Sequence, residues 1–261
     1  MTYNLAEFPD IQAGKLWFYF RRSEFRVILN HLPSQAFRGY HYNMEDNTRK
    51  TKEDIKPEYN KHNLQDQPIE FYTEKFRGAD PEEIAARTHT LYDAEDRAFS
   101  LRFLGRDYRI SWPGFEITPQ LADNSGRVLI LRYLLFAEYE AFNNHFISFR
   151  DMPSGDLYFG PFQGRCIFRF NHKYGNRRNV FEKVLDGMGA AKVDYADACY
   201  DVELLPELYI RFILWEGDDE FPASSQILFS ENFKKAFETY DLAEAGGVCL
   251  NAFGAWEASH A

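Results

Sequence analysis

The chain has 261 residues, of which 45% are hydrophobic and 17% aromatic, and its formal net charge is −10. The aromatic content excludes a disordered chain, and three cysteines without a CxxC or CxxxC pair give no disulfide scaffold, cysteine-built zinc site or iron–sulfur cluster. The acidic balance argues against nucleic acid and anionic membranes as partners. The first residues lack the features of a signal peptide, and no apolar run approaches the roughly 20 residues of a membrane span, so we expect a cytoplasmic protein.

The composition divides the chain into three parts. Residues 1–43 read as an aromatic-rich N-terminal extension, residues 44–70 as a polar loop or linker, and residues 71–261 as the main domain. The middle part has few sizeable apolar groups among many charges and amides. Burial of so few groups cannot offset the entropy lost on ordering them, which is why a linker is expected.

The main domain opens with a helix followed by a hairpin. Asp80 is placed as an N-cap and Pro81 suits the first helical position, so a helix should begin there. Residues 98–104 and 107–112 read as two strands. Between them, Gly105-Arg106 is expected to form the hairpin turn, with Gly105 supplying the positive φ.

The second half alternates helices with short strands. Residues 128–136 are apolar nearly all round, which predicts a buried helix. Gly160-Pro161 and Gly175 are expected to bound another helix. The expected strands are residues 147–150, 199–205, 208–215 and 226–229. Of these, residues 208–215 are apolar on both faces and should form a central strand. Helices are expected over residues 177–185 and most of 233–253. Strands in hairpins with helices between them predict an α+β fold, with a mostly antiparallel sheet and helices packed against it.

A basic stripe follows one face of the helix expected after Gly160-Pro161. Arg165, Arg169 and Lys173 are spaced i, i+4, i+8, and the segment 157–180 holds no Asp or Glu. The adjoining face, which should point into the core, carries Phe162, Cys166 and Phe170. The stripe is our candidate ligand-binding site for a carboxylate or phosphate. The more ordinary alternative is pairing with the protein's own C-terminal region, where residues 201–261 hold twelve acidic and three basic residues.

An acidic loop follows the expected central strand. It contains Glu216, Asp218, Asp219 and Glu220, four carboxylates that form a weak candidate site for a hard divalent cation such as Mg²⁺. The EF-hand spacing is absent. A solvated turn, in which an Asp side chain bonds its own backbone, is the more common arrangement for such a run.

Histidine and cysteine add no recognisable catalytic pattern. The seven histidines form no HxH, HxxxH or HExxH motif, and Cys166 reads most simply as a small core residue. The sequence has no GxSxG, Walker or GxGxxG motif, so hydrolase, NTPase and dinucleotide-binding functions have no support. No nucleotide cofactor is indicated, and a divalent metal is the one cofactor left open.

Four stretches carry a resemblance to a known family. They are DPEEIA (residues 80–85), FLGRDYRI (103–110), ISFRDMP (147–153) and LWEGDDEFP (214–222), the last of which continues to ILF (227–229). Over about residues 76–253 the chain resembles the family called domain of unknown function 3786. It departs from that pattern at Ser230, where the family has Asp.

The resemblance implies a setting rather than an activity. The family belongs to anaerobic bacteria and archaea and is sometimes joined to iron–sulfur-type modules, which implies a cytoplasmic role in anaerobic metabolism. No catalytic residue is carried over, because the family has no assigned activity. Our leading hypothesis is a non-enzymatic binding or accessory domain that recognises an anionic small molecule or a protein partner. The alternative is a divalent-metal-dependent enzyme that acts on an anionic small molecule through residues 216–220.

Overall fold

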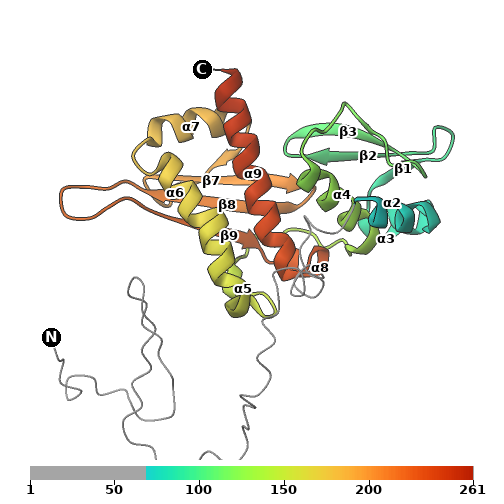
Figure 1. The fold of residues 1–261 in the computed structure, drawn as a ribbon, viewed down its shortest axis with the longest axis horizontal. Coiled ribbons are helices and arrows are strands. Elements are labelled where there is room, and N and C mark those ends of the chain that lie inside the picture. Colours follow the sequence, from blue (N-terminus) through green and yellow to red (C-terminus); the bar gives the residue numbers. More distant parts are fainter. Residues whose placement is uncertain (1–68, 261) are drawn as a thin grey trace, which may run out of the picture. The chain divides into compact units, whose positions relative to one another are not determined.

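The computed structural model describes residues 69–260, which form an α+β fold with two antiparallel sheets (Figure 1). The expected α+β class is confirmed, although the strands divide between two sheets. The N-terminal extension and nearly all of the linker lie outside the described residues. Residues 69 and 70, expected to end the linker, instead begin helix α2 (Ile69–Gly78). No helix among residues 69–260 combines the length and apolarity that crossing a membrane requires.

The first sheet has four strands in the order β1-β2-β3-β4. These are β1 (Leu91–Asp93), β2 (Ala98–Phe103), β3 (Arg106–Ser111) and β4 (Ile117–Thr118). The β2–β3 hairpin turns through Leu104 and Gly105, one residue earlier than expected, because Arg106 already pairs with Phe103. Both turn residues have positive φ, 49° and 74°, the backbone of a type I′ turn.

Two helices near this sheet begin at Asp caps. Asp80 accepts hydrogen bonds from the backbone N of Glu82 and Glu83 at the start of α3 (Pro81–Thr88), as the sequence predicts. Asp123 caps α4 (Asn124–Phe136) in the same way. Residues 128–134 of α4 are all buried, as expected, whereas Phe136 at the end of the expected buried helix is 48% exposed.

The second sheet has five strands in the order β5-β9-β8-β7-β6. Their bounds are β5 (Phe146–Ser148), β6 (Ala191–Lys192), β7 (Ala198–Leu205), β8 (Leu208–Trp215) and β9 (Ser224–Ser230). Strand β8 lies in the middle, as its two apolar faces predict. Its Phe212 is fully buried against the rings of Phe170 and Phe253, at centroid distances of 5.4 and 5.0 Å.

A long helix packs over this second sheet. It consists of α5 (Gly155–Phe162), one π-helical turn (Gln163–Ile167) and α6 (Phe168–Tyr174), and it runs beside α9 (Thr239–Ser259) (Figure 1). Phe162, Cys166 and Phe170 are fully buried, as their spacing predicts. The expected start near Pro161 is wrong, since the helix begins at Gly155. Only glycine fits there, because a Cβ would lie 2.2 Å from the carbonyl oxygen of Phe149.

The remaining helices are shorter. A 3₁₀ turn (Phe149–Asp151) follows β5, and α7 (Arg178–Gly187) precedes β6. The helical segment expected over residues 233–253 is interrupted at Phe237, which has extended backbone angles. This break separates α8 (Phe233–Ala236) from α9 and brings the start of α9 close to α2 and α4.

Candidate anion-binding pocket

The basic stripe lies against α9. Arg165 pairs with Glu244 at 3.0 Å, Arg169 donates to the side-chain oxygen of Asn251 at 2.7 Å, and Lys173 pairs with Glu257 at 3.0 Å. These contacts are the internal pairing that the sequence left open as an alternative. They spread the three cations along the seam between this helix and α9. A role for the stripe in ligand binding stays a prediction.

The acidic loop projects from the second sheet between β8 and β9 (Figure 1). Asp218 accepts hydrogen bonds from the backbone N of Phe221 and Glu220, at 2.7 and 2.9 Å, and these bonds hold its pKa below the usual value. Glu216 instead pairs with Arg178 at 3.2 Å. Within the described range, no three His, Cys, Asp or Glu side chains lie close enough together to hold a metal ion. A metal site at Glu216, Asp218, Asp219 and Glu220 stays a prediction.

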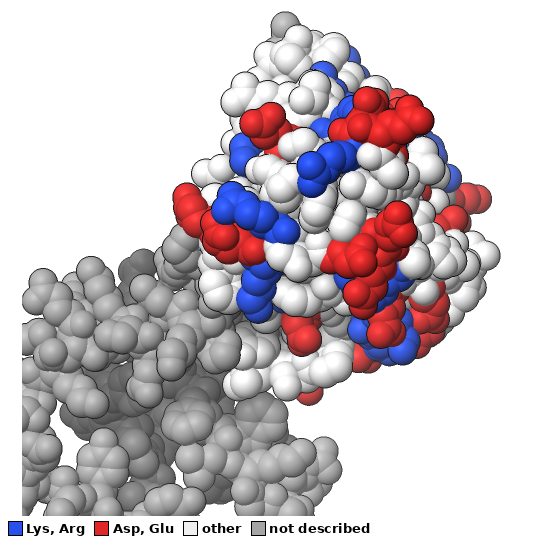
Figure 2. All heavy atoms as spheres, turned by 90° about the vertical axis from the view of Figure 1, so that its right-hand side faces the viewer, with Lys and Arg blue, Asp and Glu red and all other residues white. Residues whose placement is uncertain are grey.

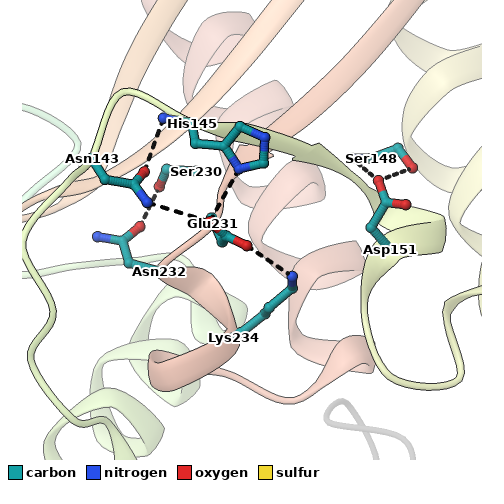
Figure 3. Close-up of polar contacts among 8 residues, drawn as sticks. All are labelled: Asn143, His145, Ser148, Asp151, Ser230, Glu231, Asn232 and Lys234. Carbon is teal, nitrogen blue, oxygen red and sulfur yellow. Dashed lines mark hydrogen bonds and ion pairs between the residues drawn. The ribbon is translucent and has the colours of Figure 1, made fainter.

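A polar network surrounds the end of β9 (Figure 3). Glu231 contacts Lys234 at 3.2 Å, Asn143 at 3.3 Å and His145 at 3.1 Å, and these contacts lower its pKa. Next to it, the fully buried Ser230 accepts the backbone N–H of Tyr209 and donates to the side chain of Asn232. Ser230 therefore has a structural role in linking β9 to the backbone of β8 and to the side chain of Asn232.

A pocket of about 470 Å³ lies between α2, α4, α8 and the start of α9. Four cationic side chains and two acidic ones line it, in a chain whose net charge is −10. On the face shown in Figure 2, basic and acidic side chains are interspersed. The charged lining residues are Lys75, Arg132, Lys234, Lys235, Glu238 and Asp241, and the aromatic ones are Phe71, Tyr72, Phe136, Phe237 and Tyr240.

Arg132 is the most deeply placed cation of the pocket. It lies on α4, whose burial carries the guanidinium into the interior, where its side chain is 8% exposed. Its Nε is 2.8 Å from Oδ1 of Asp241, and its Nη1 donates to the hydroxyl of Tyr72 at 2.6 Å. The guanidinium also lies 4.7 Å from the ring centroid of Tyr240.

The Arg132–Asp241 ion pair leaves hydrogen-bonding capacity unused. Among the described residues, Arg132 Nε and Asp241 Oδ1 are both buried and face each other at 2.8 Å as an ion pair, although they are not aligned as a hydrogen bond. Within the same range, Nη2 of Arg132 donates to no protein acceptor. Buried polar atoms are normally satisfied. The Nη2 group of Arg132 is therefore available to an acceptor that the described residues do not supply.

The two members of the pair differ in how they titrate. Burial raises the pKa of Asp241 from 3.8 to about 7, because the loss of hydration outweighs the attraction of Arg132. For Arg132, burial alone would lower the pKa, but the attraction of Asp241 raises it overall. The guanidinium thus stays cationic, and Asp241 is the group that changes charge near neutral pH.

Sequence reasoning did not find this pocket, although one signal for it was present. Arg132 is the single charged residue among the apolar positions 128–136 of a helix expected to be buried. A charge carried into a core needs a partner, so Arg132 could have been singled out. Its partner Asp241, and the lysines on α2 and α8, come from segments far away in the chain, and only the tertiary fold brings them together.

Comparison with known proteins gives a family without an activity. Residues 80–252 match the family model described as Domain of unknown function (DUF3786). Neither the curated proteins nor the solved structures include a match to this chain.

Proposed function

We propose that this chain, which belongs to that family of unknown function over residues 80–252, is a binding domain. It recognises a small anionic molecule in the pocket beside Arg132. The observation that carries the proposal is the buried guanidinium of Arg132, which is paired with Asp241 and borders a cavity with three lysines. As part of this proposal, we infer from the family resemblance a role in the cytoplasm and in anaerobic metabolism.

Charge and size both support an anionic ligand. The lining charges sum to +2 when Asp241 and Glu238 are ionised, from four cations and two carboxylates. Hydrogen bonds between charged groups are about twice as strong as neutral ones, and arginine offers a carboxylate or phosphate two parallel donors. A volume of about 470 Å³ lies within the range of roughly 300–1,000 Å³ that is usual for small-molecule sites.

The alternative function, a metal-dependent enzyme, receives less support. It requires Glu216, Asp218 and Asp219 to share one cation, yet Glu216 is engaged by Arg178 and Asp218 by its own backbone. The pocket also lies on other elements than this loop. The arrangement of the described residues therefore favours binding over metal-dependent chemistry.

The proposal is tested by titrating the full chain with acetate, octanoate and inorganic phosphate while recording NMR chemical shifts. Two exposed pocket lysines, Lys75 and Lys235, are replaced together by Gln, and the matched control replaces Lys183 and Lys192, which lie outside the pocket. We expect the pocket variant to bind about tenfold more weakly, because charge-assisted hydrogen bonds are worth about 1.5–3 kcal/mol. The control should match the wild type. Binding that is absent, or equal in both variants, would refute the proposal.

A further inference from the structure

Two phenylalanine rings stand half exposed at the mouth of the Arg132 pocket. Phe71 on α2 is 47% exposed and Phe136 at the end of α4 is 48% exposed. Both line the pocket, and Phe71 and Phe136 pack edge-on against the intervening ring of Tyr72, at centroid distances of 5.2 and 6.4 Å. Large apolar groups gathered at one exposed place usually mark a binding surface.

Lys75 lies between these two rings. Its Nζ is 4.8 Å from the centroid of Phe71 and 5.6 Å from that of Phe136. The rings hold the ammonium group at the pocket mouth by cation–π attraction. Cation and apolar surface are therefore presented together at the mouth, with the guanidinium of Arg132 deeper in the same pocket.

From this arrangement we propose that the ligand is an anion with a planar aromatic body, a statement that rests on the proposed function and names its ligand class. The anionic group would reach Arg132 or Lys75, and the flat body would pack against Phe71 and Phe136. Aromatic pairs gain affinity beyond the area they bury when they stack with an offset or meet edge to face. An inorganic anion would leave this aromatic surface unused.

A polyphosphate fits the lining less well. The pocket's four charged groups besides Arg132 and Lys75 are all engaged or acidic: Lys234 pairs with Glu231 at 3.2 Å, Lys235 pairs with Glu138 at 3.9 Å, and Glu238 and Asp241 are carboxylates. Clustered phosphates would meet these carboxylates at close range, and like charges repel. A single anionic group attached to an aromatic body satisfies both the cations and the rings.

The test compares two carboxylates of equal charge, 1-naphthoate and octanoate, by NMR titration of the full chain. The first has a planar aromatic body and the second a flexible aliphatic one. We expect naphthoate to bind about tenfold more tightly to the wild type. In the double variant Phe71→Leu/Phe136→Leu, which keeps apolar bulk but removes the rings, the two affinities should become equal. Phe168→Leu is the matched control, because Phe168 is exposed on α6 and does not line the pocket.

The outcomes separate this inference from the proposed function. If both carboxylates bind equally to the wild type and the Lys75/Lys235 variant weakens both, the pocket binds anions but the aromatic ligand class is wrong. Octanoate binding more tightly than naphthoate, or a preference that survives the double variant, would also overturn it. If neither carboxylate binds, the proposed function fails together with this inference.

Discussion

Arg132→Gln should destabilise the protein by an amount that depends on pH. The substitution leaves the carboxyl group of Asp241, 1% exposed, without its cation, and breaking a buried pair in this way costs about 3–5 kcal/mol when the remaining group stays charged. Asp241 can avoid part of that cost by taking up a proton. Without Arg132, the pKa of Asp241 should rise further above its wild-type value of about 7.

The size of the pH effect follows from linkage. At pH 5.5 Asp241 is protonated in both folded proteins, so the variant loses only the contacts of the guanidinium. Above pH 7 the wild-type carboxyl ionises beside Arg132, whereas the variant keeps its proton. The cost of the substitution then grows by about 1.36 kcal/mol per pH unit. Between pH 7 and 8.5 this gives an increase of about 2 kcal/mol.

Urea denaturation of the full chain, followed by circular dichroism at pH 5.5 and 8.5, measures this difference. Arg169→Gln is the matched control, since Arg169 is exposed and its partner Asn251 is neutral, so its small cost should not change with pH. A cost for Arg132→Gln that is equal at the two pH values would refute the reasoning, because it would mean that Asp241 does not titrate in this interval.

Three further outcomes are expected, each measured as a shift in the urea midpoint. Arg165→Gln should lower the free energy of unfolding by about 1–3 kcal/mol, because Glu244 is only 8% exposed and loses its cation. An unchanged midpoint would contradict this pairing and would favour the basic stripe as a vacant anion site. Phe212→Ala should cost about 3–5 kcal/mol through a cavity under the central strand, and a loss below about 1 kcal/mol would contradict its central position. Asp80→Ala should cost about 1 kcal/mol, the usual value of an N-cap, unless α3 is held by packing alone.

The free energy of unfolding of the wild-type protein should depend on pH through the titration of Asp241. Its folded-state pKa is raised from 3.8 to about 7, so its protonated form stabilises the folded state at low pH, and this contribution is lost as pH rises from about 4 to about 7. Asp241→Asn removes the titrating group while keeping an oxygen to accept from the backbone N of Glu238. The stability of wild type relative to this variant should fall across that interval; a constant difference would contradict the raised pKa.

The parts of the fold that the sequence predicted are those fixed by neighbours along the chain. The four-residue spacing of Phe162, Cys166 and Phe170 places them on one helical face, and they are buried. The two apolar faces of residues 208–215 require cover on both sides, which only a central strand receives. The cap at Asp80 depends on bonds to residues two and three positions away.

The pocket was beyond such reasoning because it is built from distant segments. Its cations on α2, α4 and α8 meet only when the break at Phe237 turns the chain toward the start of α9. The start of the long helix was missed for a related reason, since Gly155 is required by the carbonyl of Phe149, a contact that no periodicity records. The basic stripe was found, but its partners on α9 were not, because spacing identifies a face and not what covers it.

The acidic residues along α9 differ in their access to solvent, and this gradient determines how the helix should respond to salt. From its first turn to its last, Asp241, Glu244 and Glu257 are 1%, 8% and 21% exposed, and each pairs with a cation on another helix or the segment that follows it. Mobile ions weaken the attraction between exposed charges increasingly as salt shortens the Debye length, which is about 8 Å at physiological ionic strength, and they affect buried pairs far less. Rising salt should therefore weaken the ion pairs of Glu257 at the C-terminal end of α9. The pair of Asp241 at the start of α9, beside the pocket, should change little.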